Sequence, residues 1–199
     1  MTSHYQFLVD TYQTERIKTL AVWRQFQDKD LHVRPNPNDP RGRNLLEQMI
    51  HQCISEDLWF KNMLGIEVHA PPLPQLETRQ AFIKQYHSDS RNRLELLKSK
   101  DDNWWEAITS FFGEERSRAW VMTRRIVHSA HHRGQLTYLL RMLGEPLYSN
   151  YGPTADTGGL FINQAPTIYA YGDEESIVLD KEMNPLPENN ENPVTERPD

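Results

Sequence analysis

The segment EERSRAWVMTRRIVHSAHHRGQLTYLLRML, residues 114–143, decides the fold of this chain. Four of its apolar residues fall near one azimuth when each residue advances by about 100°, as in an α-helix: Val121, Leu136, Leu139 and Leu143. Gly144 and then Pro146 end the pattern, and Glu114 and Glu115 are expected at the positive, amino-terminal end of the helix. The segment therefore predicts one long helix with an apolar stripe that faces inward.

Three further helices are predicted upstream of this segment. Residues 3–30 contain no glycine or proline, whereas the turn at 35–40 holds three prolines, which no helix could continue through. The second helix is predicted over residues 44–64 and the third over 77–100, followed by a packed connection over 101–112. Four helices of this length with short links predict an all-α fold, an up-down four-helix bundle.

The bundle is expected to span residues 1–144, after which the chain changes character. Glycines and prolines in residues 145–172 predict a loop-rich extension that packs on the bundle, and residues 167–171 could form a short strand in it. Residues 173–199 hold nine acidic and two basic side chains, with several prolines and asparagines. That composition predicts a solvated, disordered tail. A length of 199 residues suits one domain with such an appendage.

Charge and composition argue against several classes of function. The formal net charge of the chain is −6, and the acidic tail accounts for all of it, so the bundle offers no basic excess for binding nucleic acid. No apolar run is long enough to cross a membrane, and the first ten residues do not resemble a secretory signal. The one cysteine, Cys53, allows no intrachain disulfide and is expected to be a small buried apolar residue. These features favour a cytoplasmic protein.

The candidate chemistry lies in the histidines of the last helix. His128 and His132 are about 40° apart on a helix and share the azimuth of the apolar stripe, so both imidazoles should point into the bundle. His131 should lie at the edge. Two inward imidazoles one turn apart have the spacing that binds a transition metal. The alternative is that they are ordinary core histidines whose nitrogens bond to backbone carbonyls or carboxylates.

A third ligand would have to come from another helix. His51, in the second helix, sits at the margin of an apolar face and could point inward. Glu47, four residues earlier, could be a fourth ligand or a general base facing the metal. It is also spaced from Asn44 as the N3 residue of a capping box, which is the favoured interpretation.

Other polar and aromatic residues are assigned more ordinary roles. Glu56 and Asp57 are expected on a solvated helix face. Arg133 and Gln135 are expected to contact the metal ligands or a neighbouring helix, and Arg124 could attract an anionic substrate. Four aromatic residues are interpreted as packing, with one wall of a substrate pocket as the alternative: Trp104, Trp105, Phe111 and Phe112.

The run from His128 to Leu136, HSAHHRGQL, together with YLLRMLG at residues 138–144, resembles the last-helix signature of the DinB-like superfamily, a group of damage-inducible four-helix-bundle metalloproteins. The likeness covers about residues 1–144, and the motif YGPTADTGG at 151–159 is similar to the extension of some members. By position, the resemblance places the three metal ligands of that family on His51, His128 and His132. It implies Zn²⁺, or Ni²⁺ in some members, and a homodimer as a common state.

The resemblance also implies the kind of chemistry. Some relatives depend on a low-molecular-weight thiol, so the first hypothesis is a metal-dependent enzyme that activates a thiol for transfer or a water for hydrolysis. The second is a non-catalytic protein of stress response, in which the metal staples the bundle. The third is an interaction module that uses the acidic tail. The expected partner is a small-molecule substrate, without nucleic acid or membrane.

Overall fold

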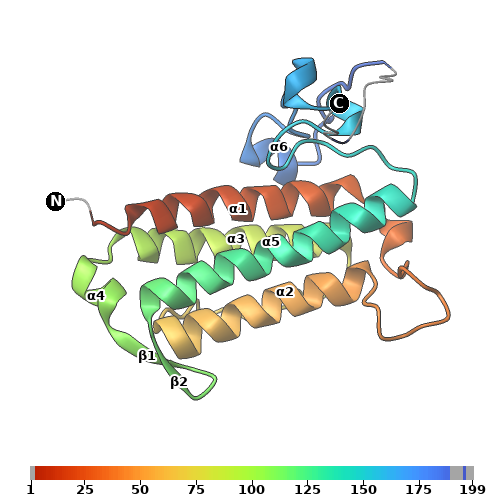
Figure 1. Ribbon diagram of the computed structural model, residues 1–199. Helices are drawn as coiled ribbons and strands as arrows, with labels where there is room; N and C mark the ends of the chain where they lie inside the picture. The colour runs from red at the N-terminus through yellow and green to blue at the C-terminus, as the bar shows by residue number, and fades with distance from the viewer. Residues whose placement is uncertain (1–2, 189–194, 196–199) are drawn as a thin grey trace.

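Four long helices lie side by side in the computed structural model, which describes residues 3–188 and 195 (Figure 1). These helices are α1 (Gln6–Gln25), α2 (Leu45–Trp59), α3 (Arg79–Lys98) and α5 (Arg118–Met142). A short π-helical turn, Phe60–Leu64, continues α2 before Gly65 adopts a left-handed conformation with φ of 65°. The all-α four-helix bundle expected from the sequence is confirmed.

The order of helix directions is up-down-down-up. Arg79, at the start of α3, donates a hydrogen bond to the carbonyl of Arg24 near the end of α1 and pairs with Asp28 just beyond it. Because α2 also begins at that end of the bundle, α2 and α3 run in the same direction (Figure 1). The link over residues 65–78 must therefore travel the length of the bundle as one long crossover connection. The sequence predicts helices that alternate in direction, and the pair α2 and α3 departs from that alternation.

A β-hairpin stands where the sequence predicts the start of the last helix. Strands β1 (Ile108–Phe111) and β2 (Glu114–Ser117) pair antiparallel, and the turn residues Phe112 and Gly113 both have positive φ. Such a two-residue turn matches the twist of the strands it joins. Glu114 and Glu115 therefore lie in a strand, and their predicted place at the helix start is wrong. The helix begins instead at Ser117, whose side chain caps the amide of Trp120.

The core has two apolar ends and a polar middle. One apolar cluster gathers around Trp23, Met49 and Leu140, and the other around Phe60 and Trp105. Between them, side chains with charges or hydroxyls are buried on all four long helices: Glu15, Arg16, Ser55, Glu56, Ser90, Arg93, Arg125, Ser129, His132 and Arg133. We call this set the polar layer. Because buried charges are costly unless paired, it requires specific partners across the bundle.

The segment after the bundle folds back over α1 and α3. Residues 167–171 form no strand, and the helix α6 (Glu174–Val178) packs on the bundle with Ile177 only 1% exposed. The side chain of Arg24 donates to the carbonyl of Ile177 at 2.8 Å. The predicted disorder is therefore wrong for this part of the tail, because a buried apolar residue and a buried guanidinium hold it. Residues 189–194 and 196–199 of the predicted tail lie outside the described residues.

No helix in the described part of the chain has the length and apolar character needed to cross a membrane.

Glu174 fastens this segment through a charge. Its carboxylate pairs with the buried guanidinium of Arg16, and Nε2 of His87 lies 2.9 Å away. Burial acts to raise the pKa of Glu174, but the hydrogen bonds from His87 and Arg16 outweigh it and hold the pKa at about 2, below its usual value of 4.5. A carboxylate whose pKa is lower in the folded than in the unfolded state stabilises the fold at pH values above its unfolded-state pKa. That stabilisation is lost as the pH falls toward the folded-state pKa.

We therefore expect Glu174→Gln to lower the free energy of unfolding by about 1–3 kcal/mol at pH 7. The difference from the unchanged protein should shrink between pH 4.5 and pH 2, because the unchanged protein then loses the same charge. Urea unfolding at a series of pH values measures this difference in the free energy of unfolding. The neighbouring, exposed Glu175→Gln is the matched control and should stay within about 0.5 kcal/mol at every pH. A constant difference across the pH series would contradict the assignment.

Candidate metal centre

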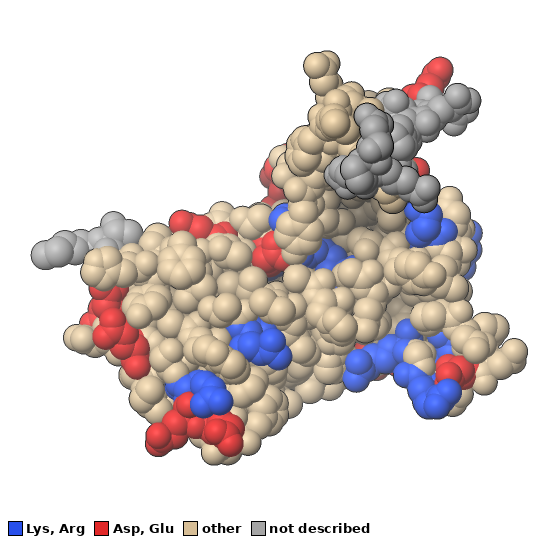
Figure 2. All heavy atoms as spheres, in the orientation of Figure 1, with Lys and Arg blue, Asp and Glu red and all other residues tan. Residues whose placement is uncertain are grey.

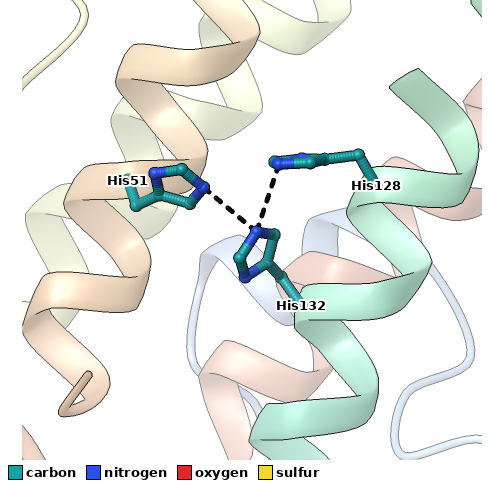
Figure 3. A group of neighbouring side chains, drawn as sticks. All are labelled: His51, His128 and His132. Carbon is teal, nitrogen blue, oxygen red and sulfur yellow. Dashed lines mark hydrogen bonds between the residues drawn. The ribbon is translucent and has the colours of Figure 1, made fainter. Parts of the chain in front are cut away.

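Three imidazoles converge in the groove between α2 and α5. His51 comes from α2, and His128 and His132 come from α5 (Figure 3). Nε2 of His132 lies 3.0 Å from Nε2 of His51 and 3.2 Å from Nε2 of His128. One ligand atom from each ring lies within 4.8 Å of the other two. Among residues 3–188 and 195, this is the one group of three such side chains close enough to share a cation.

The helical spacing explains this convergence. His128 and His132 are separated by one turn of α5 and so project from the same side of it, as the sequence predicts. His51 faces them across the groove because α2 packs beside α5. His132 reaches deepest, with 4% of its surface exposed, while the other two rings are half-buried. The trio thus sits at the level of the polar layer, with its outer side toward solvent.

The environment keeps all three rings neutral at pH 7. The pKa of His128 is lowered to about 3 and that of His132 to about 4, and burial is the largest cause for both rings. The charge of Arg125 is the second cause at His128, and neighbouring imidazoles contribute at both rings. Burial also lowers the pKa of His51, with the charge of Arg43 as the next cause. Neutral imidazoles have the free lone pair that a metal ligand requires.

Two glutamines orient the deepest ring. Nδ1 of His132 lies 2.9 Å from Oε1 of Gln48 and 3.2 Å from Oε1 of Gln135, and Gln48 donates to Gln135 at 2.8 Å. An amide oxygen only accepts, so Nδ1 carries the proton and the lone pair lies on Nε2, which faces the other two histidines. The sequence predicts a contact for Gln135. It does not predict one for Gln48, whose partner is 84 residues away.

The distances fit a shared cation. With metal–nitrogen bonds of about 2.0–2.1 Å in tetrahedral geometry, two ligand nitrogens lie about 3.3 Å apart. The two closest Nε2 pairs are near that value. Nε2 of His132 contacts Nε2 of the other two histidines, and within the described chain no hydrogen bond joins any of the three Nε2 atoms to a main-chain oxygen or a carboxylate. The alternative of ordinary core histidines bonded to carbonyls is therefore not what the structure contains.

Glu47 does not join the three histidines. Its carboxylate accepts from the amide of Asn44 at 2.9 Å and from Arg34 at 3.0 Å, which completes the capping box of α2. The cap, the favoured interpretation, is thus the role that the structure gives it, and the proposed roles of fourth ligand and general base are not supported. His131 lies outside the trio too, with its Nε2 3.1 Å from the side-chain nitrogen of Gln135.

Glu56 corrects another expectation. It is fully buried, whereas the sequence interpretation places it on a solvated face. Its carboxylate accepts from the hydroxyls of Tyr12 and Tyr86 at 2.6 and 3.0 Å. Arg93 lies 3.4 Å from it and Arg125 3.7 Å. Arg125 also donates to Ser55 on α2, so this carboxylate anchors a cation that stands behind the histidines.

The aromatic residues near the hairpin pack against one another, as the sequence predicts. Trp105 is fully buried and packs in the core. Trp59, by contrast, stacks at 5.3 Å from the ring of His128 and touches Phe111 and the exposed Phe112. Trp120 packs on Phe111 from α5. These rings form an apolar wall beside His128 at the hairpin end of the bundle, and a role of Phe111 and Phe112 in a substrate pocket stays a prediction.

Comparison with known proteins agrees with this fold. The solved structure of a DinB-like protein from Bacillus cereus ATCC 10987 superposes with a TM-score of 0.64 at 19% identity, over 75% of this chain and 99% of that one. A DinB-like protein of Bacillus subtilis, YjoA, superposes with a TM-score of 0.55 at 11% identity, over 70% and 94% of the two chains. At these identities the likeness shows the fold alone.

Sequence comparison extends the likeness. The uncharacterized protein YrdA of Bacillus subtilis (strain 168) is 28% identical over 104 residues, which are 52% of this chain and 62% of YrdA. The match thus spans less than two thirds of the curated relative. The model of the DinB family matches residues 1–158, which include all four long helices and the three histidines. This chain therefore belongs to the DinB family.

Proposed function

We propose that this protein is a metal-dependent enzyme that holds a divalent transition metal on His51, His128 and His132. The observation that carries the proposal is the convergence of exactly three neutral imidazole nitrogens, with no fourth protein ligand among the described residues. Catalytic zinc sites use three protein ligands and leave a position for substrate, whereas structural sites use four. Zn²⁺ is our first choice and Ni²⁺ the second, since imidazole suits both.

Each part of the groove then has a chemical task. A bound divalent metal supplies Lewis acidity, which favours the deprotonated form of a thiol or a water. Gln48 and Gln135 fix the tautomer of His132, so its Nε2 lone pair stays directed at the shared position. Trp59 and Phe111 cover the hairpin side of the groove with apolar surface, which keeps bulk water from that side. The proposed reaction is transfer of a small thiol to an electrophile, with hydrolysis as the variant in which water takes the place of the thiol.

Metal content and thiol binding test this proposal. Protein purified without a nickel column should contain about one divalent metal per chain by elemental analysis. Small thiols such as 2-mercaptoethanol and cysteine should raise Tm in the metal-loaded protein and leave it unchanged after treatment with chelator. S-methylcysteine, which cannot become a thiolate, is the matched control. A chain whose metal is retained but whose Tm responds to no thiol would instead be the non-catalytic, metal-stabilised protein.

A further inference from the structure

A pocket adjoins the histidines on the side away from the hairpin. It has a volume of about 520 Å³, within the usual range for small-molecule sites, and lies between α5 and the loop that leads into α2. Gln48 and Gln135, which hold His132, also form part of its wall. A molecule in this pocket would thus lie directly beside the metal ligands.

The charged side chains that line this pocket are positive. Arg41 and Arg43 line it, and no carboxylate does. Asp39 pairs with Arg41, at 2.8 Å, but Arg43 is exposed and has no ion pair within the described part of the chain. Arginines gather on this part of the surface, at the right of the face in Figure 2.

A glycine keeps the floor of the pocket open. Gly134 lies in the interior of α5, where glycine costs about 1 kcal/mol relative to alanine. No packing requires it, since a Cβ at this position would meet nothing within 4 Å, and its φ is not positive. Gly134 lines the pocket. The absence of a side chain there leaves room above the helix, which is what a bound molecule would need.

We propose that this pocket selects the substrate, and that the substrate is an anionic small molecule whose carboxylate or phosphate group pairs with Arg43 while its reactive group reaches the three histidines. A metal held by three neutral imidazoles keeps its full double positive charge, and Arg43 adds to it. A neutral substrate would leave these charges uncompensated, whereas an anion relieves them, and a guanidinium pairs with such oxygens in a planar, two-bond geometry. This inference rests on the proposed function, because it assumes that the metal accepts a substrate.

Two small thiols that differ in charge test the proposal in Co²⁺-loaded protein, because the absorption of Co²⁺ reports a change of its ligands. Mercaptosuccinate carries two carboxylates and 1-thioglycerol carries none. We expect mercaptosuccinate to bind at least tenfold more tightly at low ionic strength, and Arg43→Gln to remove most of that preference without changing the affinity for thioglycerol or the Co²⁺ content. The preference should also weaken with added salt.

Two further variants complete the test. Arg91→Gln removes an exposed arginine of α3 that lies outside the pocket and has no ion pair among residues 3–188 and 195, and it should keep the full preference. Gly134→Leu should fill the pocket and weaken mercaptosuccinate selectively, with Co²⁺ content unchanged. If both thiols bind equally, or if Arg43→Gln keeps the preference, the anion pocket is wrong and the metal enzyme stands. If neither thiol alters the Co²⁺ spectrum, the proposed thiol chemistry fails and this inference fails with it.

Discussion

Glu56→Gln is expected to lower the free energy of unfolding by about 3–5 kcal/mol, the usual cost of removing one partner from a buried ion pair. The change keeps the size of the side chain and removes only its charge. Arg93 and Arg125 would then lie in the core without the carboxylate that both approach within 4 Å. The hydroxyls of Tyr12 and Tyr86 would lose a charged acceptor as well. Urea unfolding followed by circular dichroism measures the loss.

Asp57→Asn is the matched control for this change. Asp57 is the next residue of α2 and pairs with the same Arg93 at 2.9 Å, but its side chain is partly exposed to solvent. Surface pairs contribute about 0–1 kcal/mol, so this variant should lose far less stability than Glu56→Gln. If both variants lost the same free energy of unfolding, Glu56 would contribute no more to stability than the carboxylate of a surface ion pair. The free energies should be compared in metal-free protein, so that changes in metal binding do not enter.

The helices could be predicted because their signals are local. The capping box of Asn44 and Glu47 lies within one turn, and the prolines at 35–40 and Gly65 mark ends that depend on backbone geometry alone. The hairpin was not predicted, since Phe112 and Gly113 occur in an apolar stretch and only their positive φ values reveal the turn. The direction of α3 could not be predicted from the sequence either, because a link as long as residues 65–78 allows α3 to run parallel or antiparallel to α2.

The polar layer could not be predicted from periodicity. A charged residue in a helix is normally assigned to solvent, and Glu56 is buried only because its partners arrive from α1, α3 and α5. The same limit applies to Gln48, which acts on His132 across the groove. The histidines of α5 are different. Their spacing of four residues already places two of the three histidines on one side of a helix. The pattern of the second helix offered His51 only as a residue that could point inward, and the family resemblance singled it out as the third ligand.

His132→Ala is expected to weaken metal binding on the order of 100-fold. Structural zinc sites with four ligands bind with about 10–16 kcal/mol, which is about 3 kcal/mol for each ligand. His132 is the ligand whose Nε2 is nearest to both of the others, and its Nδ1 is fixed by Gln48. Its loss leaves His51 and His128, from different helices, to hold the cation alone. Competition with a chromophoric chelator gives the affinity, and elemental analysis gives the occupancy after dialysis.

His131→Ala is the matched control, because it removes the same ring one residue away. His131 packs against His132 at 5.1 Å between ring centroids but contributes no nitrogen to the trio. Its change should alter the metal affinity by no more than a few-fold. His132 is buried and bonded to Gln48, so His132→Ala should also lower the stability of the metal-free protein more than His131→Ala does. Urea unfolding of each metal-free variant measures this loss, and the metal affinities should be compared under conditions where both variants are fully folded. If His131→Ala lost the metal and His132→Ala kept it, the ligand set would have to be reassigned to the outer side of α5.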